Sequence, residues 1–153
     1  MQPLRPTLIA GLAGVVLLAL VSGCAAPPRH EAAHLATFTT RLAATNVGPP
    51  IPSQAAGTAD AVLDTQTRVL RWKMAFSNLS GPVTMAHFHG PAGIGANAGV
   101  ALGFAAPVNS PYEGRATLTP QQAADLMAGK WYINVHTARF PAGEMRGQMI
   151  ERK

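Results

Sequence analysis

Residues 69–76 alternate between apolar and polar or small side chains, and this alternation constrains the fold more than any other feature of the sequence. The apolar set includes Trp72 and Met74, whereas Arg71 and Lys73 belong to the intervening set. Successive side chains of a β-strand point to opposite faces, so a period of two predicts a strand with one buried and one solvated face. Such a strand needs further strands to cover its apolar side.

Similar patterns predict five further strands, which are separated by turn-forming Gly, Pro, Asn and Ser residues. They cover residues 35–42, 83–89, 99–104, 131–137 and 144–150. Between the last two, Pro141 and Gly143 suit positions i+1 and i+3 of a type I turn, so we expect a hairpin there. Many short strands are typical of a β-sandwich or barrel, and we therefore expect one all-β domain at residues 35–153.

One short helix is predicted at residues 120–128. Thr119 is a favourable N-cap, Pro120 suits the first helical position, and Gln122 completes a capping box. Gly129 is a typical residue for ending a helix. The expected fold is therefore an antiparallel β-sandwich or barrel with one helix packed on the sheet.

The N-terminal segment has the pattern of a bacterial lipoprotein signal peptide. An apolar and Gly run at residues 8–20 is shorter than the roughly 20 residues of a membrane-spanning helix. Small residues then lead to Cys24 in a sequence, Val-Ser-Gly-Cys, that resembles a lipobox. We therefore expect residues 1–23 to be removed and Cys24 to carry acyl chains, palmitate among them, as a membrane anchor. The alternative is a plain secretory signal peptide that happens to contain a cysteine.

Residues 24–34 contain a Pro-Pro pair and little apolar surface, so we expect a tether between the lipid and the domain. Ala25 follows the cysteine, and a residue other than Asp at this position resembles the sorting signal of outer-membrane lipoproteins. The expected location is therefore the bacterial cell envelope, on the outer membrane and facing the periplasm. The membrane is the partner that this part of the chain predicts.

Charge and cysteine content exclude several classes of protein. The 12 basic and 7 acidic residues are scattered without the basic stripe, interleaved with aromatic residues, that nucleic-acid binding requires. A single cysteine cannot form an intramolecular disulfide. No Ser/His/Asp set, carboxylate pair or Cys/His nucleophile occurs at a spacing that predicts catalysis. We therefore expect a protein that is not an enzyme and has no nucleic-acid partner.

Three histidines are candidate ligands of a metal ion. His87 and His89 are two residues apart in a predicted strand, so their side chains project from the same face. His136 lies on the polar face of the predicted strand at residues 131–137. If the two strands are neighbours, the three imidazoles can bind one copper or zinc ion. The alternative is that these histidines form hydrogen bonds that orient loops.

Glu144 and Arg146 are predicted to share a strand face beyond the hairpin turn, in position to border the histidines. Gly147 is predicted to permit a bulge or the close approach of another backbone. We favour a structural role for these three residues. A recognition surface is the alternative.

Motifs in five segments of the domain resemble those of a known family. They are AHFHGPA at residues 86–92, Gly99, Leu118-Thr119, GKWYINVHT at residues 129–137 and PAGEMRGQM at residues 141–149. Together these segments resemble the CHRD domain, first described in chordin, an extracellular antagonist of bone morphogenetic proteins, and also present in many exported bacterial proteins. The resemblance covers residues 35–150. Trp131 before the tyrosine and Met145 in place of a frequent isoleucine are small departures.

The resemblance implies an immunoglobulin-like or superoxide-dismutase-like sandwich or barrel, because the family has limited similarity to copper-zinc superoxide dismutases. Those enzymes use more histidines than the five present here and a disulfide that one cysteine cannot form, so dismutase activity is not expected. We expect a non-enzymatic binding or scaffolding module on a lipid anchor, whose protein partner the sequence does not identify. The alternative is a periplasmic protein that binds one copper or zinc ion.

Overall fold

The structure is a computed structural model that describes residues 34–153. The predicted signal peptide at residues 1–23 and residues 24–33 of the predicted tether, Cys24 included, lie outside the described residues. In chain order the elements are β1 (Leu35–Ala43), the 3-10 helix η2 (Ala44–Asn46), β2 (Ala56–Asp64), β3 (Val69–Ser77), β4 (Val83–His89), β5 (Val100–Gly103), β6 (Tyr112–Thr117), α1 (Pro120–Met127), β7 (Tyr132–Thr137), β8 (Met145–Gln148) and β9 (Ile150–Glu151).

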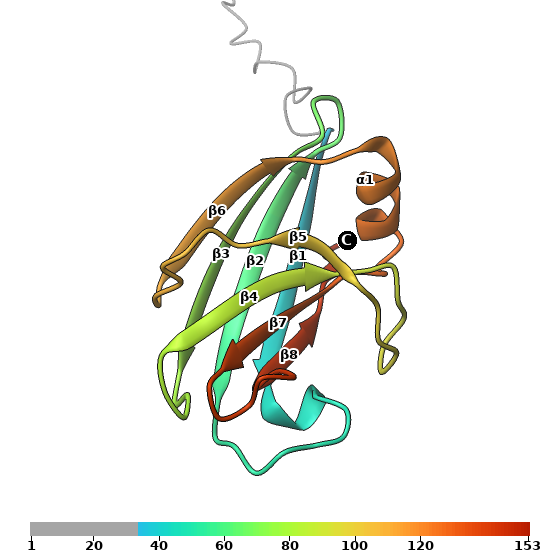
Figure 1. The fold of residues 1–153 in the computed structure, drawn as a ribbon. Helices are drawn as coiled ribbons and strands as arrows, with labels where there is room; N and C mark the ends of the chain where they lie inside the picture. The colour runs from blue at the N-terminus through green and yellow to red at the C-terminus, as the bar shows by residue number, and fades with distance from the viewer. Residues whose placement is uncertain (1–33) are drawn as a thin grey trace, which may run out of the picture.

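The strands form one curled antiparallel sheet in the order β5-β4-β7-β8-β1-β2-β3-β6, with β9 beside β1 (Figure 1). Strands β1, β2, β3 and β6 make one wall of this half-barrel, and β4, β5, β7 and β8 make the other. The two walls join where β1 meets β8, through the register pair Ala43 and Arg146. The predicted fold class, an all-β sandwich or barrel with one short helix, is therefore confirmed.

The hydrophobic core fills the concave side of the sheet. Trp72 of β3 lies edge-on to Phe88 of β4, with ring centroids 5.2 Å apart, so the two walls touch across the core. Phe104 and Trp131 extend this aromatic cluster, with centroids 5.0 and 5.5 Å from that of Phe88. Trp72 is only 5% exposed, which confirms the predicted burial of its strand face.

Strands β2 and β6 had no counterpart in the sequence predictions. The inward residues of β2 include Ala59 and Ala61, which alternate only weakly in hydrophobicity with their neighbours. In β6 the inward position opposite Trp72 is Gly114, where a Cβ atom would lie 2.2 Å from the indole ring. β6 can therefore cover Trp72 only with a glycine, and the apolar signal is lost at that position.

Helix α1 begins with the predicted capping box. The Thr119 hydroxyl accepts a hydrogen bond from the Gln122 amide at 3.2 Å, and the Gln122 side chain accepts one from the Thr119 amide at 2.9 Å. The helix buries Leu126 and ends near Gly129, whose φ is +67°. Among residues 34–153, no helix combines the length and the apolar character that crossing a membrane requires.

Candidate metal-binding site

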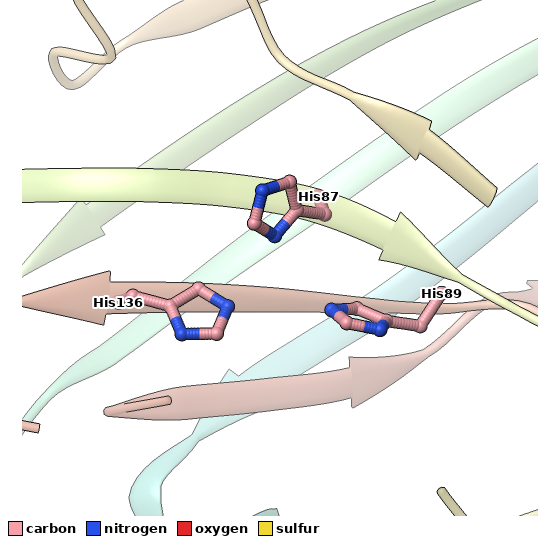
Figure 2. Close-up of side chains that lie close together, drawn as sticks. All are labelled: His87, His89 and His136. Carbon is pink, nitrogen blue, oxygen red and sulfur yellow. The ribbon is translucent and has the colours of Figure 1, made fainter. Parts of the chain in front are cut away.

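Strands β4 and β7 are hydrogen-bonded neighbours, and their outer faces carry the three histidines (Figure 2). In the antiparallel register His87 lies opposite Asn134, and His89 lies opposite Tyr132. His136 follows Asn134 by two residues and therefore projects from the same face of β7. The predicted convergence of the histidines required the two strands to be neighbours. In the fold they are.

The three imidazoles lie close together on this face. One ring nitrogen of each lies within 4.8 Å of the corresponding nitrogens of the other two. The ring centroids of His87 and His136 are 5.2 Å apart, and those of His87 and His89 are 5.5 Å apart. Metal–imidazole bonds are about 2.0–2.1 Å long, so two nitrogens on one ion lie no more than about 4.2 Å apart, and the rings would have to draw closer together to bind one.

Backbone carbonyls fix the orientation of two of the rings. Nδ1 of His136 lies 2.9 Å from the carbonyl oxygen of Pro141, and Nδ1 of His89 lies 3.0 Å from that of Ala98. A carbonyl oxygen can only accept, so each Nδ1 carries a proton, and in the neutral form of the ring Nε2 presents a lone pair. Both Nε2 atoms, together with Nδ1 of His87, are buried without a hydrogen-bond partner. Loop orientation alone therefore explains the Nδ1 bonds but not these three nitrogens.

A stack of three side chains supports His89. Its ring lies parallel to that of Tyr132, with an interplanar angle of 5° and centroids 4.9 Å apart. On Tyr132, in turn, lies the guanidinium of Arg146, 3.5 Å from the ring centroid. Arg146 also donates hydrogen bonds to Asn97 Oδ1 at 2.8 Å and to the Ala96 carbonyl. The loop between β4 and β5 is thereby fastened beside the histidines.

The histidines of β4 are held in the protonation state that metals bind. Burial lowers the pKa of His87 and of His89 and is the largest effect on both. The hydrogen bond to the Ala98 carbonyl acts against it at His89, and repulsion between protonated imidazoles, that of His136 included, lowers the pKa of both rings further. Rings with a lowered pKa are neutral at pH 7. A neutral imidazole is the form that donates a lone pair to a metal ion.

Glu144 and Arg146 were expected to share one strand face. In the structure their side chains have different surroundings. Strand β8 begins at Met145, so Glu144 precedes the strand. The Glu144 carboxylate is fully buried and accepts hydrogen bonds from Ser53, Ser80 and Thr137 at 2.6–2.8 Å. These bonds join two loops to the end of β7. Glu144 is therefore structural, whereas Arg146 reaches the histidine cluster through Tyr132.

Gly147 lies where β8 passes directly against β1. A Cβ atom here would be 2.6 Å from the Arg41 carbonyl oxygen and 2.5 Å from the Thr40 hydroxyl. The predicted close approach of another backbone is thus confirmed.

The residues that orient the imidazoles were not predicted as parts of the site. Pro141 lies in the predicted hairpin turn that follows the strand of His136. The type of turn and the position of His136 could therefore have indicated the hydrogen bond between His136 and the Pro141 carbonyl. Ala98 lies in a loop whose path no local pattern specifies. Tyr132 lies four residues before His136 in the same predicted strand, so the strand period places both on one face, but its stacking depends on the placement of Arg146.

Fold and site together define a small antiparallel β-domain with a histidine cluster on the outer face of its sheet. The family model of the CHRD domain matches residues 38–149, so the chain belongs to the CHRD family. The resemblance drawn from the motifs is therefore confirmed over most of the chain. Comparison of the chain with the curated proteins and with the solved structures found no match.

Proposed function

We propose that this protein is a non-enzymatic CHRD module of the bacterial cell envelope that binds one copper or zinc ion through His87, His89 and His136. The observation that carries the proposal is the convergence of three imidazole nitrogens that are buried without hydrogen-bond partners. A buried polar atom left unsatisfied costs about 1–3 kcal/mol, and a single ion would satisfy all three nitrogens at once. From the sequence, metal binding was the alternative to a general binding or scaffolding role, and these nitrogens are the reason for proposing that alternative.

The number of ligands indicates how the ion would be held. Zinc sites with a purely structural role are usually closed by four protein ligands, whereas three leave one position for water or another molecule. His87 and His89 are partly exposed, while His136 is buried. The open position would therefore face the solvent on the side of β4.

The proposal includes a lipid anchor. It is supported by the lipobox-like sequence that ends at Cys24 and by the short apolar run before it. Acyl chains on Cys24 would hold the domain at the outer membrane, on its periplasmic side, through the tether at residues 24–34. The ion would then be bound within reach of the membrane surface.

Titration calorimetry tests metal binding. The full chain in detergent, with Cys24→Ser to remove a thiol that itself binds copper and zinc, is titrated with Cu²⁺ and with Zn²⁺. We expect one saturable site in this protein, lost in His89→Ala and in His136→Ala. The matched control is His34→Ala, because the His34 imidazole lies 3.7 Å from the Asp64 carboxylate at the β1–β2 end of the sheet.

The controls separate loss of ligand from loss of fold. Each variant is first melted without metal, and only variants that unfold cooperatively are titrated. Absence of saturable binding at micromolar protein contradicts the proposal. Unchanged binding in both His89→Ala and His136→Ala contradicts it as well, because the ion would then lie elsewhere.

A further inference from the structure

A fourth side chain projects beside the histidine cluster from β4. Met85 lies opposite His136 in the β4–β7 register and precedes His87 by two residues. It therefore shares the outer face of β4 with His87. Directly opposed residues of an antiparallel pair have Cβ atoms about 4.5–5.5 Å apart, which is within the reach of a methionine side chain. The thioether can thus approach an ion bound by the histidines.

An irregularity in β4 sets up this arrangement. Val83 lies opposite Thr137 and Met85 opposite His136, so two steps along β4 correspond to one step along β7. Val83 consequently packs against the core, while Thr84 and Met85 are both exposed. β-bulges often occur next to functional sites, where they change the direction of a side chain. Here the bulge leaves Met85 on the same face of β4 as His87, while Val83 still points toward the core.

The exposure of Met85 is not explained by packing. Its side chain is 50% exposed, although it belongs to a strand whose inward residues Ala86 and Phe88 are fully buried. In the described domain the other methionines are Met74, Met145 and Met149, each 0% exposed, and Met127 of α1, 37% exposed. Methionine has three rotatable bonds and a polarisable sulfur, so a side chain in this position can move over the imidazoles.

We propose that Met85 is a fourth ligand and that the site selects copper in its monovalent state. This inference rests on the proposed function and specifies its metal. Imidazoles bind zinc and copper alike, whereas a thioether is a soft ligand that favours Cu(I). The complete set would be three neutral imidazole nitrogens and one neutral sulfur.

The electrostatics of the site agree with an ion of low charge. The clustered ligand set, as found within residues 34–153, contains histidines and no carboxylate. The guanidinium of Arg146 is separated from the His89 ring by the Tyr132 ring alone. Repulsion from a neighbouring cation is half as large for a monovalent ion as for a divalent ion at the same distance.

The test compares Met85→Leu with Met127→Leu, which removes the other exposed thioether of the described domain. Both substitutions are made in the full chain carrying Cys24→Ser. Cu(I) affinity is measured without oxygen by competition with a chromophoric Cu(I) chelator, and Zn²⁺ affinity by calorimetry. We expect Met85→Leu to weaken Cu(I) binding about tenfold, or about 1.4 kcal/mol, and to leave Zn²⁺ binding within about twofold. Met127→Leu should change neither.

Each outcome distinguishes this inference from the proposal on which it rests. Equal Cu(I) affinity in Met85→Leu and its parent overturns the role of Met85 and leaves the three-histidine site standing. An equal loss of both metals also overturns it, because Met85 would then support the strand rather than the ion. If the parent protein binds neither metal, both proposals fail. X-ray absorption of the Cu(I) form gives an independent result: a sulfur neighbour of copper that Met85→Leu removes supports the inference, and nitrogen neighbours alone overturn it.

Discussion

Glu144 is the only fully buried carboxylate among residues 34–153. Burial by itself raises the pKa of this carboxyl group, but hydrogen bonds from Thr137, Ser53 and Ser80 outweigh burial and hold the pKa below its ordinary value of 4.5. The group is therefore ionised at neutral pH. Its charge strengthens the hydrogen bonds that join the loops before β2 and β4 to the end of β7.

We predict that Glu144→Gln lowers the free energy of unfolding by about 1–2 kcal/mol at pH 7, because neutral hydrogen bonds replace charge-assisted ones. A carboxyl group whose folded pKa is lowered contributes stability above its unfolded pKa and loses it as pH falls through the folded value. The difference between wild type and variant should therefore shrink below about pH 4.5. Denaturant unfolding from pH 7 to pH 3 measures it.

The matched control for this substitution is Glu113→Gln. Glu113 is exposed and lies 3.3 Å from Lys73 on the surface of the sheet, so its removal should change stability little at any pH. A difference between wild type and Glu144→Gln that stays constant from pH 7 to pH 3 would show that the charge of Glu144 is not what stabilises the loops.

The sequence predicted the histidines of the cluster but not their surroundings. The two-residue spacing of His87 and His89, and the polar face that carries His136, follow from the strand period alone. Their convergence also required β4 and β7 to be neighbours, which is a property of the whole sheet. The contact between His89 and the Ala98 carbonyl depends on the course of a loop, and residue patterns do not determine that course.

At the scale of elements, the junction between β1 and β8 is where the two walls of the half-barrel meet. The two strands share a single register pair, and Gly147 lies beside it against the backbone of β1. A side chain at position 147 would push the strands apart. The absence of a side chain there is therefore a condition for joining the walls.

We predict that Gly147→Ala lowers the free energy of unfolding by about 1–3 kcal/mol, because the added methyl group overlaps the Arg41 carbonyl. Thermal unfolding followed by circular dichroism measures the change. Gly81→Ala is the control, since a Cβ atom at residue 81 meets nothing within 4 Å. A melting temperature of Gly147→Ala equal to that of the control would mean that β1 and β8 can separate without loss of stability.

The elements that the sequence predicted are those with strong local signals. Strand β4 has the predicted bounds, and α1 begins at its predicted capping box. Strands β2 and β6 escaped prediction because alanine and glycine occupy inward positions where space is limited by Trp72 and its neighbours. Their strand character comes from pairing with β3 rather than from their own composition.

At the scale of the whole molecule, the proposed link between the described domain and a membrane rests on the N-terminal segment alone. We predict that Cys24→Ser abolishes labelling by a radioactive fatty acid and releases or mislocalises the protein. The reason is that the cysteine thiol is the acceptor of the lipid in the predicted lipobox. Cell fractionation after labelling measures both effects.

His30→Ala, within the predicted tether, serves as the control for the anchor and should keep both the label and the membrane location. Equal labelling of wild type and Cys24→Ser would contradict the lipidation of this cysteine. The protein would then reach the envelope by a plain secretory signal peptide.

The histidine cluster lies on the outer face of β4 and β7, whereas the hydrophobic core lies on the inner face. Substitutions of the outer residues can therefore create or abolish a ligand set while the interior keeps the same packing. Evolution can change the ligand of such a domain without rebuilding its scaffold. Within one family, proteins with the same architecture can bind different ligands. We expect such differences to appear as substitutions of the outer residues of these two strands.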